Sequence, residues 1–168
     1  NASFTIPQLA GQYNITIFAN DTSNNLNSTE RTNFNVTLSN SAPQITLVQV
    51  SNTIFPLEAG IRYVDVNFTV FDSDGASDIN LSSAVLNFSR TGETTKQNVS
   101  CLNISSSTNE INFTCNIGMN YFDVPGVWNV TVAVKDNFGA AAINSSNSFT
   151  YAQLIAMVLS PNSISWST

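Results

Sequence analysis

Residues 126–136 read GVWNVTVAVKD, and this stretch decides the fold of the chain. Apolar and polar side chains alternate along it, which is the pattern of a β-strand with one buried face. The face expected to be buried comprises Trp128, Val130, Val132 and Val134, and the other comprises Asn129, Thr131, Ala133 and Lys135. The stretch therefore predicts a strand that covers a hydrophobic core. Trp128 is expected in that core, the alternative being an aromatic sugar-binding patch.

The same pattern occurs near the beginning of the chain. Residues 11–21 read GQYNITIFAND and align with residues 126–136 at an offset of 115 residues, with Tyr13 in the place of Trp128. The same offset places Phe34 on Phe149, in the strand expected to follow. One offset that serves two neighbouring strands indicates internal duplication, which is typical of tandem arrays.

The rest of the chain also consists of short alternating segments separated by turn residues. Strands are predicted at residues 44–50, 63–71, 84–90, 98–104, 110–117 and 146–151. Apolar residues occupy both odd and even positions of 63–71, so this strand is expected to be covered on both faces. No segment has helical periodicity. The predicted fold class is all-β, with tandem antiparallel β-sandwiches.

The repeat also predicts how the chain is divided. Residues 1–42 are expected to be the C-terminal strands of one sandwich, and residues 43–152 a complete sandwich of seven strands. Residues 153–168 are expected to form the first strand of a following sandwich or a strand donated to a neighbour. We expect the chain to be a piece of a longer polypeptide.

Thirteen Asn-X-Ser/Thr triplets, none with Pro in the middle, are distributed along the chain. Such a triplet is the acceptor for N-linked glycans on secreted proteins. The acceptor residues are Asn1, Asn14, Asn20, Asn27, Asn35, Asn67, Asn80, Asn87, Asn98, Asn103, Asn112, Asn129 and Asn144. The triplets predict an extracellular, glycosylated surface; the alternative is a proteome rich in Asn, Ser and Thr. Asn112 lies between two core candidates, Ile111 and Phe113, and is expected to be buried or at a sheet edge.

Composition limits the classes of function. Apolar residues make up 42% of the chain, enough for a core, whereas charged residues make up only 10%. A net charge of -6 argues against nucleic acid as a partner. No apolar stretch has the length of a membrane-spanning helix, so we expect no direct insertion in a membrane. The chain has no histidine, which removes the usual general base, and we expect no enzyme; the alternative is a hydrolase with an Asp pair.

The two cysteines, Cys101 and Cys115, form an even pair. In an extracellular protein such a pair indicates a disulfide, the alternative being two free thiols.

Four aspartates are the best candidates for site chemistry. Asp72, Asp74 and Asp78 lie in the sequence DSDGASD after the strand 63–71, and Asp136 and Asn137 lie at the end of the strand 126–136. The loops after these strands lie at the same end of a β-sandwich, so the carboxylates are expected to come together. Carboxylate oxygens are ligands for Ca²⁺, which is the expected metal. The alternative is an ordinary turn in which the carboxylates accept backbone N–H groups.

Residues 43–152 resemble the immunoglobulin-like or PKD-like modules that occur in tandem in archaeal and bacterial surface proteins, including S-layer glycoproteins. The resemblance lies in DSDGASD at 72–78, in PGVWNVTV at 125–132 and in DNFG at 136–139. It implies a structural segment of a cell-surface lattice, sheath or filament, with copies of the same protein as partners. A binding ectodomain, such as an adhesin or receptor, is the alternative, and an accessory module of a carbohydrate-active enzyme is a third. Similarity to cadherin-like arrays implies that Ca²⁺ stiffens the junction between modules.

Overall fold

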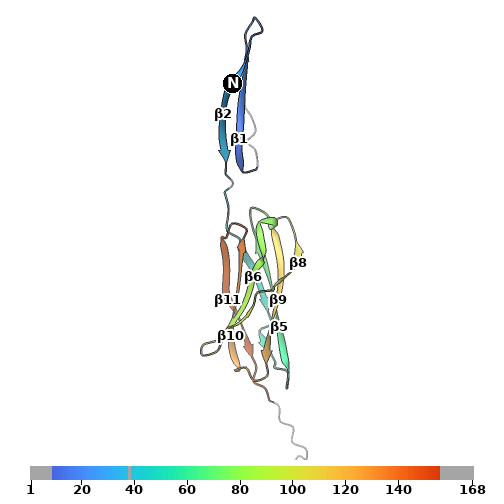
Figure 1. Cartoon of the computed structure of the whole chain (residues 1–168). Helices are drawn as coiled ribbons and strands as arrows, with labels where there is room; N and C mark the ends of the chain where they lie inside the picture. Colours follow the sequence, from blue (N-terminus) through green and yellow to red (C-terminus); the bar gives the residue numbers. More distant parts are fainter. Residues whose placement is uncertain (1–8, 38, 156–168) are drawn as a thin grey trace, which may run out of the picture. The chain divides into compact units, whose positions relative to one another are not determined.

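The computed structural model describes residues 9–37 and 39–155, and the chain divides into two units, residues 1–40 and 41–168 (Figure 1). Asn1 and residues 156–168, which include most of the segment predicted to begin a new strand, lie outside the described residues. Within the described ranges, no helix has the length and apolar character needed to cross a bilayer.

The first unit contains an antiparallel hairpin of β1 (Gly11–Asn20) and β2 (Leu26–Val36). Its turn is closed by Asp21, whose Oδ1 accepts hydrogen bonds from the backbone N–H groups of Ser23 and Asn25 at 2.9 and 2.8 Å. Tyr13 and Phe34 lie opposite each other, with stacked rings 5.6 Å apart. The alternation seen in the sequence is thus expressed as one apolar and one polar face.

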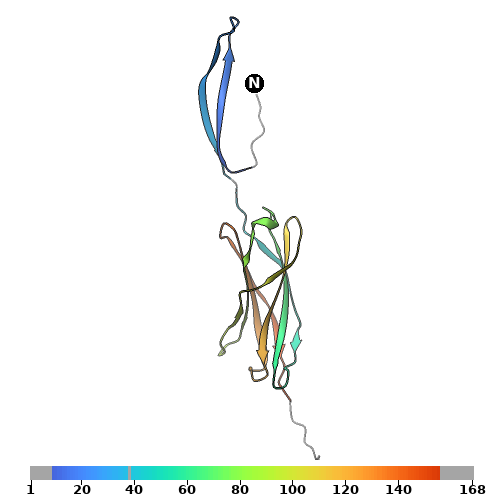
Figure 2. The same cartoon turned by 45° about the vertical axis from the view of Figure 1, so that its right-hand side comes forward.

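The second unit is built from two sheets. The five-stranded sheet has the order β4 (Thr53–Ile54), β11 (Ala141–Tyr151), β10 (Gly126–Asp136), β6 (Ile79–Ser89) and β7 (Lys96–Asn98). The four-stranded sheet has the order β3 (Gln44–Val50), β5 (Ile61–Phe71), β9 (Glu110–Asn120) and β8 (Leu102–Ser106). All pairs are antiparallel except β4–β11 (Figure 2). The predicted all-β sandwich class is confirmed. Apart from one 3-10 turn, η1 (Ala76–Asp78), the described residues contain no helix.

The core lies between the two sheets and follows the period of two. Trp128, Val130, Val132 and Val134 are all buried, as the opening stretch predicts. The Trp128 indole N–H donates to the carbonyl of Val124 at 3.0 Å, which satisfies its one polar group. Trp128 is therefore a core residue and not part of a sugar-binding surface.

The prediction of one strand at 98–104 is wrong. The chain forms β7 and β8 instead, and these belong to different sheets, since β7 pairs with β6 and β8 pairs with β9. Asn98 turns the chain between them, because its Oδ1 accepts the Ser100 N–H at 2.7 Å. This split, together with the short β4, gives nine strands in place of the seven expected.

The prediction that residues 63–71 are covered on both faces is also wrong. Even positions of β5, such as Val66 and Phe68, are buried, whereas Tyr63 is 61% exposed. The odd-numbered face of this strand is the outer face of the sandwich. The aromatic side chains of this outer face lie at the two ends of the strand. Their apolar character is the reason that the sequence predicted a second buried face.

Candidate metal centre, glycan acceptors and disulfide

Three aspartates from separate segments meet at one end of the sandwich. Asp72 directly follows β5, Asp78 ends η1, and Asp136 ends β10. β10 is paired with β6 so that Asp136 lies opposite Ile79, the residue after Asp78. One carboxylate oxygen from each of the three lies within 4.8 Å of the others. We refer to Asp72, Asp78 and Asp136 as the Asp cluster.

Asp72 is completely buried. Its Oδ1 accepts the N–H of Asp74 at 2.9 Å, which forms the turn that the alternative interpretation expects. Its Oδ2 is also buried but receives no hydrogen bond. A buried carboxylate oxygen without a donor is costly, so this atom points to a positive ligand in the cluster.

Asp78 is half-buried, and its Oδ2 likewise lies inside the protein without a donor. Burial, followed by the negative charges of Asp72, Asp136 and Asp74, raises the pKa of the Asp78 carboxyl above its ordinary value. A metal ion in the cluster would offset the same negative charges that raise this pKa.

Asp136 is buried and serves its own turn as well as the cluster. Its Oδ1 accepts the N–H groups of Phe138 and Ala140 at 2.9 and 2.8 Å. Asp21 makes the equivalent pair of bonds in the first hairpin. The aspartate at this position is therefore explained by the turn in both hairpins, and only the second hairpin adds carboxylates from other strands.

The remaining members of the predicted set do not join the cluster through a carboxylate. Asp74 is exposed, and its Oδ2 accepts the N–H of Ser41 at 2.6 Å. Asn137 ties the loops together instead, donating from its backbone to Asp78 O at 2.8 Å and from its side chain to Ser77 O at 3.0 Å. The sequence therefore predicted three of the four carboxylates correctly as neighbours.

One contributor was missed. The Asn109 side chain donates to the carbonyl of Asp72 at 2.8 Å, and its backbone carbonyl accepts the Asp72 N–H at 2.8 Å. Asn109 thereby holds Asp72 against the β8–β9 turn. Nothing in the sequence distinguishes it from the many other asparagines.

Every described glycan acceptor is at least partly accessible. Seven are exposed, namely Asn14, Asn20, Asn27, Asn35, Asn67, Asn103 and Asn129. Five are half-buried, namely Asn80, Asn87, Asn98, Asn112 and Asn144. Asn129 and Asn87 lie on the outer face of the five-stranded sheet, and Asn67 and Asn112 on the outer face of the four-stranded sheet.

Four acceptors already donate from their side-chain nitrogen. Asn20 and Asn103 donate to residues three or four positions away, to Asn24 Oδ1 at 2.8 Å and to Ser106 Oγ at 2.9 Å, whereas Asn112 and Asn98 bond to other segments. The Asn112 side chain donates to Ser105 Oγ at 2.9 Å and accepts from Thr69 Oγ1 at 2.6 Å. The Asn98 side chain donates to the carbonyl of Asn116 at 2.6 Å. A glycan on any of these nitrogens would remove a hydrogen from a bonded donor.

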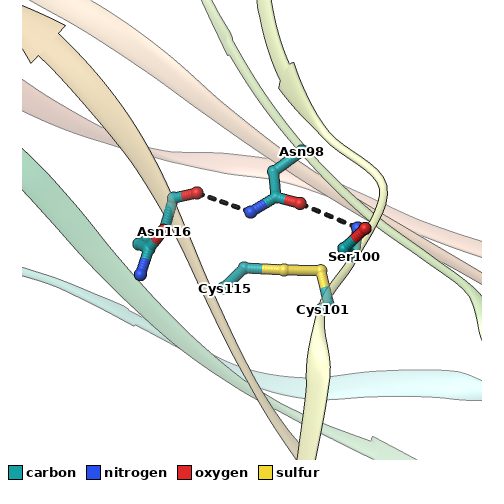
Figure 3. Close-up of a disulfide and its surroundings, with 5 residues drawn as sticks. All are labelled: Asn98, Ser100, Cys101, Cys115 and Asn116. Atoms are coloured by element: carbon teal, nitrogen blue, oxygen red, sulfur yellow. Dashed lines mark hydrogen bonds between the residues drawn. A yellow bond between two sulfur atoms is a disulfide. The ribbon is translucent and has the colours of Figure 1, made fainter.

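Cys101 and Cys115 form a disulfide with their Cα atoms 4.6 Å apart, as predicted (Figure 3). Cys101 lies in the connection between β7 and β8, and Cys115 is buried at the centre of β9. Figure 3 also shows the Asn98 side chain bridging to Asn116 beside the disulfide. The disulfide and this bridge together fasten the point at which the chain changes sheets.

Comparisons with known proteins do not assign this chain to a family. No family model matches it. No curated protein sequence matches it either. Among solved structures, it is similar to the PKD domain of an M14-like peptidase from Thermoplasmatales archaeon SCGC AB-540-F20. The two are 15% identical, with 68% of this chain and 100% of that chain covered at a TM-score of 0.42.

Proposed function

We propose that this chain is a structural segment of an extracellular glycoprotein that forms part of a surface lattice, sheath or filament. The observation that carries the proposal is the distribution of glycan acceptors over the outer faces of both sheets. Asn87 and Asn129 lie on one face and Asn67 on the other, with side chains that are exposed or half-buried. A sandwich with sugars on both faces presents solvated surfaces, which suits a repeated extracellular spacer.

The disulfide supports the same compartment, because disulfides persist in oxidising environments such as the cell exterior. Low charge supports it as well. Only 10% of residues are charged, so amides, hydroxyls and attached glycans would supply most of the hydration. We assign the segment no catalytic activity and no nucleic-acid partner; its proposed partners are copies of itself.

We further infer that the Asp cluster binds Ca²⁺. Three carboxylates, two of which carry a buried oxygen without a donor, suit a hard cation that takes oxygen ligands. Asp74 links the neighbouring loop to Ser41, where the polypeptide enters the sandwich. Metal at the Asp cluster would therefore stiffen the entry end of this unit.

Native material tests the structural proposal. Mass spectrometry of glycopeptides should find sugar at Asn129 and Asn67, and cryo-electron microscopy of the cell surface should find this unit in regular contact with its copies. Unmodified asparagines throughout, or an isolated unit without homotypic contacts, would refute the proposal. Calcium titration with melting curves tests the metal separately: a chelator should lower the Tm of the wild type but not that of Asp72→Asn.

An adhesin or receptor-like ectodomain is the second candidate. The loops at 72–78 and 136–139 contain no acceptor triplet, and Phe138 is 72% exposed among them. A binding role predicts that Phe138→Ser abolishes attachment to a target surface without affecting assembly. Under the structural proposal the same substitution leaves both surface location and assembly unchanged.

A further inference from the structure

Two acceptor triplets interlock on the outer face of the four-stranded sheet. They are Asn67-Phe68-Thr69 on β5 and Asn112-Phe113-Thr114 on β9. Asn67 lies opposite Thr114, and Thr69 lies opposite Asn112, so the acceptor of each triplet faces the hydroxyl residue of the other. The two middle phenylalanines point inwards and stack in the core, with ring centroids 5.1 Å apart. Both acceptors are therefore fixed side by side on the same face.

Hydrogen bonds distinguish the two acceptors. Thr69 Oγ1 donates to Asn112 Oδ1 at 2.6 Å, and Asn112 Nδ2 donates to Ser105 Oγ at 2.9 Å, so both ends of this amide are used. The Asn67 side chain is exposed and makes no hydrogen bond within the described part of the chain. Asn67 is therefore the member of the pair whose nitrogen can carry a sugar without the loss of a bond.

The free acceptor opens into a groove. A cavity of about 200 Å³ has Asn67, Thr69 and Asn112 among its lining residues, together with two apolar side chains, Leu47 of β3 and Ile104 of β8. We call it the acceptor groove. Its volume is several times the roughly 30 Å³ that one water molecule occupies, so it has room for a larger polar group.

The apolar side chains form the walls of the acceptor groove. Leu47 is 47% exposed and Ile104 is 58% exposed. They lie on the two edge strands of the sheet, with β5 and β9 between them. At the usual strand spacing of about 4.8 Å the two edge backbones are about 14 Å apart, and side chains rising from both edges leave room between them for a single sugar ring.

The lining of the groove matches the chemistry of a sugar. A pyranose ring has apolar C–H faces and an edge of hydroxyl groups. Leu47 and Ile104 offer apolar contact to the ring, whereas the amide and hydroxyl groups of Asn112 and Thr69 on the floor offer hydrogen bonds. A few polar groups between apolar walls are what orients a small ligand in a protein site.

We propose that the first sugar of a glycan attached to Asn67 lies in the acceptor groove, between Leu47 and Ile104. The inference rests on the proposed glycosylation of this chain. Attachment joins Asn67 Nδ2 to the anomeric carbon of an activated glycosyl phosphate donor, with release of the phosphate and of one amide proton. The bond holds the sugar at the groove, where the effective concentration of a short tethered ligand is in the millimolar range. Docking covers two apolar side chains and orders the base of the glycan.

Carbon relaxation measured by NMR tests the proposal. The sample is the full chain, produced in a host that attaches N-linked oligosaccharides and trimmed to a single N-acetylglucosamine at each occupied acceptor. The anomeric C–H of the sugar on Asn67 should have an order parameter of about 0.85, as in a rigid backbone, and should show nuclear Overhauser effects to the methyl groups of Leu47 and Ile104.

Asn129 provides the matched control acceptor. It is also exposed and lies on a central strand, but its cross-strand partners are Ser89 and Ser148, which offer no apolar wall. The order parameter of its sugar should be below about 0.6, the value of a flexible group.

Two double variants locate the contact. Leu47→Ser with Ile104→Ser should lower the order parameter of the Asn67 sugar to that of the Asn129 sugar. Val127→Ser with Ile143→Ser removes two apolar side chains that are 55% and 70% exposed on the other sheet, and should leave the Asn67 sugar ordered. Unchanged amide shifts along β9 show that both variants are folded.

Three NMR results would overturn the proposal. A sugar on Asn67 that is as mobile as the sugar on Asn129 leaves the groove empty. A sugar that stays ordered in the Leu47→Ser and Ile104→Ser variant is held elsewhere. Overhauser effects that vanish on dilution from about 500 to about 50 μM come from the sugar of a second copy.

Glycopeptide mass spectrometry of the native protein separates this inference from the structural proposal. If Asn67 is unmodified while other acceptors carry sugar, the groove has no tethered occupant and only this inference is wrong. If no acceptor carries sugar, both are wrong.

Discussion

The hairpins β1–β2 and β10–β11 share their sequence pattern and strand pairing but differ in what surrounds them. Tyr13 pairs with Phe34 exactly as Trp128 pairs with Phe149, each partner displaced by the same 115 residues. Both hairpins also have a register irregularity, between Ile17 and Ala19 in one and between Val130 and Val132 in the other. Burial separates them, because Val132 is 0% exposed whereas its counterpart Ile17 is 54% exposed. Alternation and turn residues are thus sufficient to define a hairpin, and a second sheet is needed to make a core.

The largest expected effect comes from separating the two units. Residues 41–168 should fold alone and unfold cooperatively in urea, because their hairpin is covered by the β3–β5–β9–β8 sheet. Residues 1–40 should lack protected amides in hydrogen exchange, since an isolated two-stranded hairpin is at best marginally stable. Stable, protected β1–β2 amides in the short fragment would contradict this view of the comparison.

Equivalent core positions should respond unequally to truncation. Trp128→Ala should destabilise the sandwich by about 3–5 kcal/mol, as removal of a fully buried aromatic side chain does. Tyr13→Ala, at the aligned position, should leave the urea midpoint of the sandwich unchanged within error. A similar loss in both variants, measured on the full chain, would mean that the first hairpin contributes to the same cooperative unit.

The disulfide occurs only in the covered unit, and its removal should cost less than the loss of Trp128. Cys101→Ala with Cys115→Ala should lower the free energy of unfolding by about 2–4 kcal/mol, since the chain between them is no longer closed in the unfolded state. Asn98→Ala serves as a milder comparison, because it removes the hydrogen bonds of one side chain, to the Asn116 carbonyl and from the Ser100 N–H, and leaves the disulfide closed. Urea unfolding of oxidised wild type and both variants gives the ranking; an unchanged midpoint without the disulfide would contradict it.

The smallest effect concerns acid dependence, where Asp21 in the first hairpin and Asp78 in the Asp cluster of the second unit should have opposite signs. Hydrogen bonds, first from the Asn25 side chain, lower the pKa of Asp21, so its contribution is present above the ordinary Asp pKa of about 4 and is lost as pH falls. Burial and neighbouring carboxylates raise the pKa of Asp78, so its contribution is present below that pH and is lost as pH rises.

Melting curves of residues 41–168 in a chelator check the sign for Asp78. The difference in Tm between wild type and Asp78→Asn should shift against the wild type as pH rises above about 4. Calcium should reverse the trend, adding about 2.7 kcal/mol of stability at a hundredfold excess over Kd. A wild-type advantage that grows with pH in the absence of metal would show that the pKa of Asp78 is not raised.

Strand positions were the most predictable part of the fold because one buried face imposes a period of two. The sheet change between Asn98 and Leu102 was not predictable in this way, since both sides of the break have strand-like residues. What divides them is a side-chain turn and a cross-link, which leave no periodic signal. The outer face of β5 was wrongly predicted to be buried, because Tyr63 has an aromatic side chain that is nevertheless exposed in the fold.

The Asp cluster was predictable from topology and not from spacing. Two loops at the same end of a β-sandwich carry Asp72 and Asp136. These residues could therefore be predicted to lie close together, although 64 positions separate them in the sequence. The prediction that Asp74 joins the cluster was wrong. Asp72 accepts the backbone N–H of Asp74 to form the turn, and the Asp74 side chain is left exposed, where it accepts the N–H of Ser41. Asn109 could not be predicted, because its role depends on the exact approach of the β8–β9 turn.

The short parallel pair β4–β11 has a consequence for tensile load. The polypeptide enters the sandwich through β3 and leaves after β11, and β4 runs in the same direction as β11. A pull on entry and exit would draw these two strands past each other, so the bonds Thr150–Asn52 and Ala152–Ile54 would be strained together in shear rather than opened one after another. Force spectroscopy reads this directly, as a single high rupture peak that falls in Thr150→Pro, which lacks the N–H that donates to Asn52. Two residues of strand would then act as the mechanical clamp of the unit.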